Sequence, residues 1–273
     1  MRLLRMDRRI ITGGALAAVL DLIFPPICLG CEREQRPGPL QLGLCLRCRG
    51  RLKPLRGARC AACGRPLSAV APPAGYLCGG CRERRPAFDR LWAIWSYEPP
   101  LEQVIHALKF GRLDFLGSHL AKEIWHRMGG ELRRTDVVVP VPLHWRRQMA
   151  RGYNQAERIA RPLARRLGRP LVTALRRSRA TPPQAQLERS QRQRNLRRAF
   201  RGRRATAIRG RRVLLVDDVT TTGATLDHAA AALRRIGTVS ITALTVGRTP
   251  APSAARASSG PSPEGALAAR FGR

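Results

Sequence analysis

Apolar residues without polar alternation mark the core segments of this chain. The run Val213–Val216 is rich in β-branched types and predicts a buried strand, because a strand covered on both faces needs no polar positions. Directly behind it, Ala224–Ile236 is rich in Ala and Leu and predicts a helix. Asp136–Val141 is a second buried-strand candidate, although Pro140 and Pro142 should take the chain out of the sheet there. Other strands are expected at 88–97, 171–175 and 239–246, and a further helix from Pro99.

Two carboxylates and a turn of small residues separate the strand at 213–216 from the helix behind it. Asp217 and Asp218 end the strand, and the turn contains Thr220, Thr221, Thr222, Gly223 and Thr225. Small residues leave backbone N–H groups uncovered, and threonine hydroxyls can donate hydrogen bonds. The positive end of the helix dipole lies near Ala224. These parts predict a phosphate cradle beside two carboxylates that can accept hydrogen bonds from hydroxyl groups.

Other classes of protein also place acidic residues after an apolar strand. In a receiver domain such a strand opens a domain of about one hundred residues or more, whereas only 55 residues follow Asp218 here. A Walker P-loop needs a Gly-Lys pair, and the sequence contains none. An ordinary strand, turn and helix without a ligand remains the simplest alternative.

All eight cysteines lie between Phe24 and Pro86, in four Cys-x2-Cys pairs separated by 13, 11 and 14 residues. Each pair can form a knuckle that points two thiolates at one tetrahedral ion, so eight ligands suit two zinc ions. The simplest pairing is sequential, although the spacing also allows an interleaved one. The ligands are Cys28, Cys31, Cys45 and Cys48, followed by Cys60, Cys63, Cys78 and Cys81.

Other uses of these cysteines fit less well. A disulfide framework would suit an oxidising compartment, and iron–sulfur sites have tighter or less regular spacing. A closed shell of four thiolates leaves no open coordination position, so we expect the zinc to be structural rather than catalytic. A segment this small and rich in Pro and Gly could not hold itself together without metal.

Composition narrows the class of protein. A chain of 273 residues with 44% hydrophobic content is ordinary for one or two soluble domains. The formal net charge of +33 favours contact with a polyanion such as nucleic acid. Nearly all the basic residues are Arg, with Lys only at positions 53, 109 and 122, which a GC-rich coding bias would also produce. The charge alone therefore does not decide between these two origins.

The N-terminal segment has some features of a signal peptide. Its apolar run Ile10–Leu20 is too short to cross a bilayer as a helix, and Asp21 follows at once. We expect instead a helix that packs on the rest of the protein. The sequence has no other long apolar run, so a cytoplasmic protein without a membrane span is expected.

Four sequence motifs together resemble a known family. VDDVTTTGAT is similar to the phosphoribosyl pyrophosphate (PRPP) motif of type I phosphoribosyltransferases. With PVPLHWRRQMARGYNQA, RATPPQAQLERSQRQRN and the Cys-x2-Cys pairs, the chain from Phe24 to Arg248 resembles the ComF family of competence-associated proteins. The resemblance implies an α/β fold: a type I phosphoribosyltransferase core with a mainly parallel sheet, preceded by a zinc-ribbon domain. The expected parts are an N-terminal helix (1–23), a double zinc ribbon (24–86), the core (87–248) and a disordered tail (249–273).

The resemblance also implies roles for individual residues. Asp217 and Asp218 would bind the ribose 2′ and 3′ hydroxyls of PRPP, and Mg²⁺ would accompany the pyrophosphate. The 5′-phosphate would be held by Thr221, Thr222, Gly223, Ala224 and Thr225, and the pyrophosphate by Arg146, Arg147 and Arg151. A flexible loop within 176–198 would close over the ligand, with Arg179, Gln184 and Arg194 as contacts. Neither His106 nor Lys109 is assigned to the site.

The family implies a role in natural transformation, through single-stranded DNA and competence-machinery proteins as partners. The resemblance implies ligand binding more directly than catalysis, because Thr221 stands where purine-salvage relatives have an acid. The chain would therefore be either a phosphoribosyltransferase or an inactive DNA-binding or adaptor module that uses the fold to sense a nucleotide.

Overall fold

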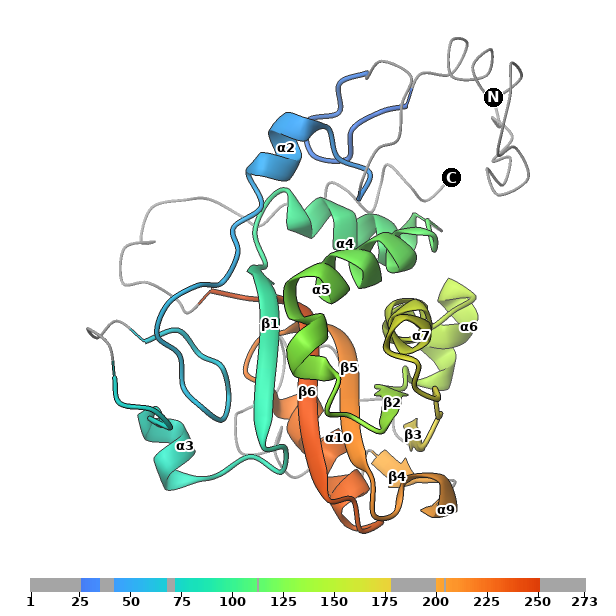
Figure 1. Cartoon of the computed structure of the whole chain (residues 1–273). Helices are drawn as coiled ribbons and strands as arrows, with labels where there is room; N and C mark the ends of the chain where they lie inside the picture. The colour runs from blue at the N-terminus through green and yellow to red at the C-terminus, as the bar shows by residue number, and fades with distance from the viewer. Residues whose placement is uncertain are drawn as a thin grey trace.

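A four-stranded parallel sheet forms the centre of the computed structural model, which describes residues 26–34, 42–67, 72–111, 113–177, 200–203 and 205–250. The strand order is β1-β6-β5-β2, and all three pairs are parallel (Figure 1). Because the strands run the same way, their carboxyl ends meet at one edge of the sheet. Their bounds are β1 (Arg90–Ser96), β2 (Val137–Pro140), β5 (Arg212–Thr220) and β6 (Ser240–Arg248).

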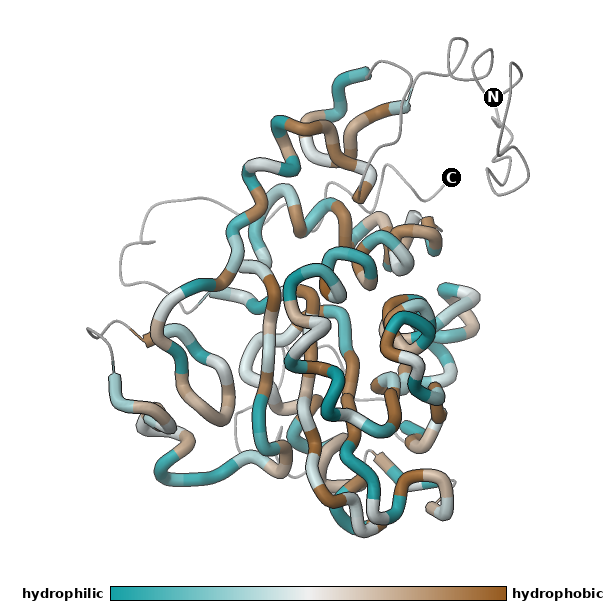
Figure 2. Tube along the Cα trace, viewed as in Figure 1, coloured by the Kyte–Doolittle hydropathy of each residue, from teal (hydrophilic) through white to brown (hydrophobic). Residues whose placement is uncertain are grey.

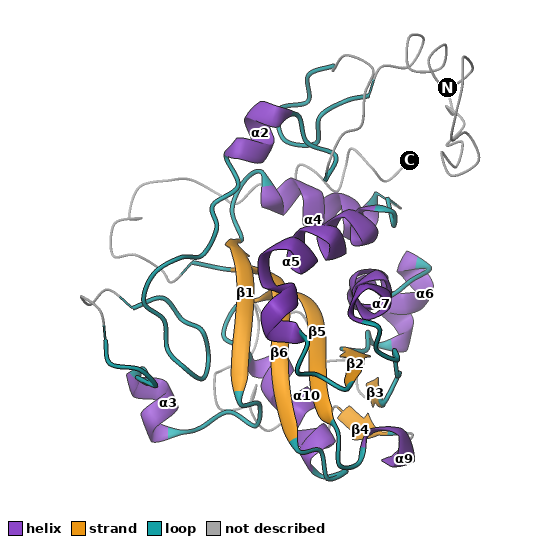
Figure 3. Cartoon of the chain, in the orientation of Figure 1, coloured by secondary structure: helices purple, strands orange, loops and turns teal. Residues whose placement is uncertain are grey.

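Helices cover both faces of this sheet (Figure 3). In β5, Val213 and Leu215 belong to one buried cluster, while Leu214 and Val216 belong to another. Successive side chains of a strand point to opposite faces, so the apolar run supplies both clusters at once. One face carries α4 (Leu101–Phe110), α5 (Leu116–Leu132) and α7 (Gln155–Leu167), and the other carries α10 (Ala224–Arg234).

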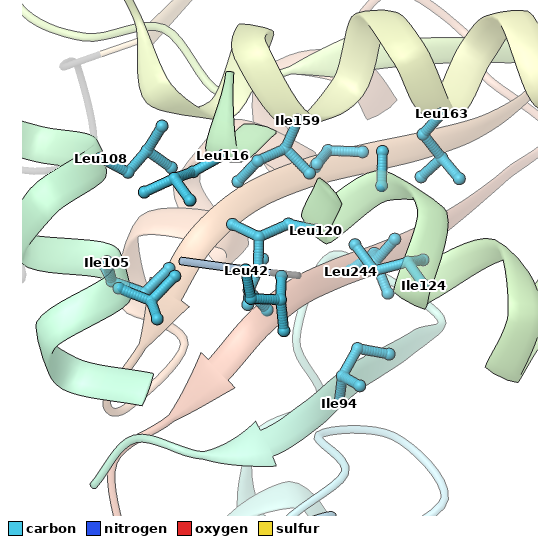
Figure 4. Packing of buried hydrophobic residues seen from close by; sticks show 14 of the residues in the cluster. Leu42, Ile94, Ile105, Leu108, Leu116, Leu120, Ile124, Ile159, Leu163 and Leu244 are labelled. Atoms are coloured by element: carbon cyan, nitrogen blue, oxygen red, sulfur yellow. The ribbon is translucent and has the colours of Figure 1, made fainter. Parts of the chain in front are cut away.

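The larger cluster joins three helices to the sheet. Ile105 from α4, Leu120 from α5 and Ile159 from α7 belong to the same buried cluster as Leu244 of β6 (Figure 4). Along α7, brown and teal residues alternate in Figure 2, because its apolar side chains face the sheet and its arginines face outward. Leu42, from the segment between the first two cysteine pairs, is also fully buried in this cluster. The N-terminal cysteine segment therefore contributes to the main core.

Several shorter elements complete the fold. The strands β3 and β4 pair antiparallel as a separate two-stranded sheet, and α6 follows β2. No helix among the described residues is long and apolar enough to cross a membrane. The remaining bounds are α2 (Leu46–Gly50), α3 (Gly79–Glu83), α6 (Trp145–Arg151), β3 (Leu175–Arg177), β4 (Phe200–Gly202) and α9 (Ala205–Ile208).

The structure changes some of the boundaries expected from the sequence. The strand expected at 213–216 continues to Thr220, so Asp217 and Asp218 lie within β5. Pro140 stays in the sheet, because β2 is an outer strand and the next N–H, from Val141, donates to the Val216 carbonyl at 2.9 Å. The helix α6 was not expected.

Other expectations shift by a few residues or cannot be compared with the structure. The strand expected at 171–175 is an isolated bridge at Leu171, and β3 begins at Leu175. The expected helix at 1–23, the loop contacts Arg179, Gln184 and Arg194, and the tail beyond residue 250 lie outside the described residues.

Two glycines of α5 provide a matched test of helix packing. A Cβ on Gly117 would lie 2.4 Å from the Arg158 carbonyl oxygen of α7, whereas nothing lies within 4 Å of a Cβ on Gly130. We expect Gly117→Ala to destabilise the protein by about 1–3 kcal/mol, because the two helices must separate. Gly130→Ala should stabilise it by about 0.5–1 kcal/mol, because alanine favours the helix. Urea unfolding of both variants measures these changes, and equal effects would contradict this description of the α5–α7 contact.

Candidate functional site

The eight cysteines form two groups of four in sequential order. In each group every Sγ lies within 4.8 Å of the others. The Cys31 and Cys45 sulfurs are 4.0 Å apart, and the Cys63 and Cys78 sulfurs are 3.7 Å apart. A tetrahedral zinc ion with Zn–S bonds of about 2.3 Å requires sulfurs about 3.8 Å apart. The residues therefore fit two structural zinc ions, with Cys28, Cys31, Cys45 and Cys48 on one, and Cys60, Cys63, Cys78 and Cys81 on the other.

Backbone N–H groups stabilise a thiolate in each group. Cys28 Sγ accepts from the N–H groups of Gly30 at 3.4 Å and Cys45 at 3.3 Å. Burial opposes ionisation of this thiol, but these backbone donors outweigh it and lower the pKa of Cys28 to about 6. A corresponding bond from the Cys78 N–H reaches Cys60, whose pKa is also lowered to about 6 against the effect of burial. Each group thus presents a thiolate donor to the metal near neutral pH.

The two cysteine groups have different surroundings. Cys28 and Cys48 lie in the main core, with Leu101 and Leu116 in the same cluster. Cys60, Cys78 and Cys81 form a small cluster of their own with Ala62. Loss of metal from the first group would therefore disturb the main core directly, while loss from the second would act through its contacts with the sheet.

A cavity of about 370 Å³ opens at the carboxyl edge of the sheet. All four parallel strands contribute the residue that follows their last one: Tyr97 after β1, Val141 after β2, Thr221 after β5 and Thr249 after β6. Ligands of open α/β sheets bind outside the carboxyl ends of the strands. This cavity also contains the acidic pair and the whole threonine turn, and it is our candidate ligand site.

An ion pair with Lys109 gives the two acids unequal charges. Lys109 Nζ lies 2.8 Å from Asp218 Oδ2, and both side chains are largely buried. Burial opposes ionisation of Asp218, but the Lys109 charge and hydrogen bond lower its pKa below the ordinary value. Burial raises the pKa of Asp217 well above its ordinary value, and the Asp218 charge raises it further. Asp218 therefore ionises more readily than Asp217, and the two neighbouring acids differ in their tendency to carry a charge.

The turn between β5 and α10 has the geometry of an anion cradle. Gly223 precedes α10 with a φ of 85°, a left-handed conformation that glycine adopts without strain. The Thr222 hydroxyl accepts from the Ala224 N–H at 3.4 Å and fixes the first turn of the helix. Residues 220–226 all line the cavity. The N–H groups of a first helical turn and the positive dipole end favour a bound anion here.

Three arginines line the same cavity. Arg147 and Arg151 are four residues apart on α6, so they share one face of that helix, and Arg177 comes from β3. Burial lowers the pKa of both Arg151 and Arg177, and the Arg147 charge adds to this effect. Such mutual repulsion would be relieved by a bound polyanion. Arg146 is not among the lining residues, since its guanidinium lies over the Trp145 ring.

Several of the lining residues were not assigned to the site from the sequence, among them Tyr97, Lys109, Arg177 and Thr249. Lys109 carried a usable signal, because it is one of only three lysines in a chain with 51 basic residues. Arg177 carried none, because it is one arginine among many and reaches the cavity only through the β3–β4 pair. His106 does not line the cavity; its ring packs on Phe110 at 4.7 Å between centroids.

Comparison with known proteins agrees with this architecture. Residues 19–82 match the double zinc ribbon domain, and residues 154–258 match the phosphoribosyl transferase domain. The chain is 35% identical over 226 residues to DNA utilization protein YhgH of Escherichia coli (strain K12), covering 81% of this chain and 96% of that protein. It is 31% identical over 214 residues to Competence protein F of Haemophilus influenzae, covering 71% and 91%. The chain belongs to the ComF family.

The comparisons and the structure together confirm the family and the fold class that the sequence predicted for this ComF-family protein. The parallel sheet with helices on both faces and the two four-cysteine groups are the expected parts. A solved purine phosphoribosyltransferase from Pyrococcus horikoshii is similar with a TM-score of 0.30 and 20% identity, covering 48% of this chain and 83% of that one. The ligand roles expected for the cavity residues remain predictions.

The two zinc shells should respond differently to loss of a ligand. We expect Cys48→Ser to reduce zinc from two ions to one per chain and to lower the midpoint of global unfolding, because Cys48 belongs to the main core. Cys81→Ser should also remove one zinc but shift that midpoint much less. Metal analysis and thermal unfolding of both variants test this, and equal shifts would contradict the unequal placement of the shells.

Replacing each acid of the pair in this ComF-family protein by asparagine should change the free energy of unfolding in opposite directions. Asp217→Asn should stabilise the fold by about 1–2 kcal/mol at pH 7, because a neutral amide replaces a carboxyl group that resists ionisation. Asp218→Asn should destabilise it by about 2 kcal/mol, because Lys109 loses its partner. Since the folded pKa of Asp217 is raised, wild-type stability falls as pH rises above the unfolded value.

The gain from Asp217→Asn should therefore be absent below the unfolded pKa of an aspartate and should increase as pH rises toward the raised folded pKa of Asp217. Urea unfolding at several pH values measures it. A pH-independent gain, or the same sign for both variants, would show that the charges are distributed differently.

Proposed function

We propose that this ComF-family protein binds PRPP or a related phosphorylated sugar in the cavity at the carboxyl edge of the sheet. The observation that carries the proposal is the meeting of Asp217, Asp218 and Lys109 with the threonine turn and three arginines around one space. This arrangement offers hydrogen-bond acceptors for hydroxyl groups beside two separate anion sites.

The ribose would lie against the acidic pair. Asp218, whose pKa is lowered by Lys109 against the effect of burial, would accept hydrogen bonds from vicinal hydroxyls, and the Asp217 carboxyl group offers further oxygen atoms beside it. Lys109 keeps this part of the cavity electrically balanced, so a neutral diol can bind without bringing its own counter-charge.

The phosphates would occupy the two ends of the cavity. A 5′-phosphate suits the turn formed by Thr221, Thr222, Gly223, Ala224 and Thr225, where N–H groups and the helix dipole favour negative charge. A pyrophosphate suits Arg147 and Arg151, because guanidinium groups donate in pairs to phosphate oxygens. Arg177 adds a third cation to that end, whereas Arg146 points to Trp145 instead.

Magnesium fits the chemistry of this donor set. Hard divalent cations prefer carboxylate and phosphate oxygens, and the cavity offers Asp217 and Asp218. When bound with the ligand, Mg²⁺ would neutralise pyrophosphate charge and make it a better leaving group. The chain's own contribution is to orient the ribose and to hold the phosphates.

Binding is a better-supported function than turnover. Among the described residues that line the cavity, the only carboxyl groups are Asp217 and Asp218, and both are engaged as described above. No further acid there could take a proton from an acceptor. We therefore propose ligand binding or sensing as the primary activity, with phosphoribosyl transfer dependent on an acceptor that brings its own base.

We propose that this binding serves natural competence or the use of single-stranded DNA. One relative is named a DNA utilization protein and another a competence protein. The formal net charge of +33 favours contact with a phosphate backbone, and it predicts an affinity that falls steeply with salt. A reducing compartment such as the cytoplasm fits eight cysteines that form no disulfide.

Two neighbouring arginines provide a test of the ligand site. We expect PRPP with Mg²⁺ to bind the wild type saturably in calorimetry, and Arg147→Ala to weaken binding about tenfold or more by removing a charged contact. Arg146→Ala, on the same helix but outside the cavity, should bind as the wild type does. The double variant Asp217→Asn, Asp218→Asn should abolish binding.

The proposal fails if the wild type does not bind PRPP or ribose 5-phosphate. It also fails if the double aspartate variant binds normally. Equal losses in Arg146→Ala and Arg147→Ala would indicate a general charge effect rather than the site described here.

A further inference from the structure

The segment of the second cysteine group contacts residues on both sides of the threonine turn. One contact passes through Arg248, the last residue of β6, and the other through Asp227, in the first turn of α10. Neither contact involves the first cysteine group. In Figure 1, α3 lies on the β1 side of the sheet, whereas α10 lies behind it.

Arg248 connects the zinc knuckle to the end of the sheet. Its side chain is buried, with 6% of the residue exposed, and one guanidinium nitrogen donates to the carbonyl of the zinc ligand Cys63. Four thiolates around one divalent zinc would carry two net negative charges, and the buried Arg248 guanidinium, held at the Cys63 carbonyl, would offset part of that charge.

The backbone of Arg248 is continuous with the cavity. Arg248 pairs with Thr220 in the sheet register, and the next N–H, from Thr249, donates to the Thr220 carbonyl at 2.9 Å. Both Thr220 and Thr249 line the cavity. A displacement of the Arg248 side chain would therefore be transmitted to the start of the phosphate turn.

The second contact reaches the other end of this turn. Arg84, directly after the helix that carries Cys81, lies 3.3 Å from the Asp227 carboxylate. The other oxygen of this carboxylate accepts from the Ala87 N–H at 2.6 Å. Asp227 would otherwise place a negative charge beside a bound phosphate, and these donors balance that charge.

The knuckle formed by Cys60 and Cys63 also packs against strand β1 of the sheet. The Ala62 carbonyl accepts from the Leu91 N–H at 2.8 Å, and a Cβ on Gly64 would lie 2.2 Å from the Leu91 carbonyl oxygen. A knuckle of this size keeps its shape through its metal. Without zinc, the Cys63 carbonyl would lose its fixed position, and Arg248 would lose its acceptor.

We propose that zinc at the second cysteine group raises the affinity of the cavity for a sugar phosphate, with Arg248 as the positioning residue that couples the two sites. The proposal rests on the sugar-phosphate binding proposed above. It gives the second zinc a regulatory role: loss of metal from this shell to a chelator would lower ligand affinity while the main core stays folded. By linkage, the ligand must in turn strengthen zinc binding at this shell by the same factor.

The test uses the full chain loaded with two zinc ions and compares Arg248→Met with the wild type. We expect about tenfold weaker PRPP binding in calorimetry, the usual size of such a coupling, and faster release of one of the two zinc ions to a chromogenic chelator. Arg248→Lys keeps a charge but has a single donor group, and it should fall between the two. The matched control is Arg212→Met, which removes an arginine ion-paired with Asp136 at the opposite end of β5.

Cys81→Ser provides a second arm that does not depend on ligand binding. Amide hydrogen exchange at 220–225 should be faster in this variant and in Arg248→Met than in the wild type, while exchange in α5 stays unchanged.

Adding PRPP to the wild type should slow release of the same single zinc ion.

The outcomes separate the two proposals. If the wild type does not bind PRPP, the proposed ligand is wrong, but faster exchange at 220–225 would still support the coupling through Arg248. Unchanged zinc release and unchanged exchange at 220–225 in Arg248→Met would overturn the coupling even where PRPP binds. Faster exchange throughout the chain would show general destabilisation and would also overturn it.

Discussion

Strand β5 is covered on both faces, and this constraint decides where polar groups can lie. Its apolar residues fill two separate cores, so a carboxylate can be accommodated only where the covering helices end. Asp217 and Asp218 occupy that point while still in the strand, and Lys109 of α4 supplies the charge that makes their burial tolerable. The cavity exists because four parallel strands end together above these residues.

The electrostatics of the cavity suit an anionic ligand with hydroxyl groups. Lys109 balances one acid and the other resists ionisation, so the cavity's acids contribute little net negative charge. Arg147, Arg151 and Arg177 then give the lining an excess of positive charge in the absence of ligand. Such crowding costs stability in the free protein, and a bound polyanion would recover that cost.

The two zinc shells are integrated into the fold in different ways. The first contributes two cysteines and Leu42 to the main core, where hydrophobic packing and metal binding support each other. The second forms a separate small cluster. Arg248 of β6 donates to the Cys63 carbonyl of this cluster, and Arg84, which follows α3, forms an ion pair with Asp227 of α10. A double zinc ribbon therefore combines a structural part with a part whose contacts lead toward the ligand cavity.

The amino-acid sequence by itself determined those features of this protein that depend on residues close together in the chain. The apolar run at 213–216, the small-residue turn and the regular Cys-x2-Cys spacing each depend on neighbouring residues, and the sequence therefore predicted the buried strand, the helix behind it and the metal ligands. It also predicted the family, because the motifs are contiguous. The sequential pairing of the cysteines was only the simplest option until the sulfurs were placed within 4.8 Å of one another.

The tertiary structure decided which distant side chains meet. Lys109, Arg177 and Arg248 belong to segments far apart in the chain, and nothing in their local sequence distinguishes the two arginines from their many neighbours. Only the parallel strand order brings β1, β2, β5 and β6 to one edge, and only the placement of α6 separates Arg147 from Arg146. Local patterns fix secondary structure through short-range sterics and burial, whereas a binding site depends on long-range packing that no single segment encodes.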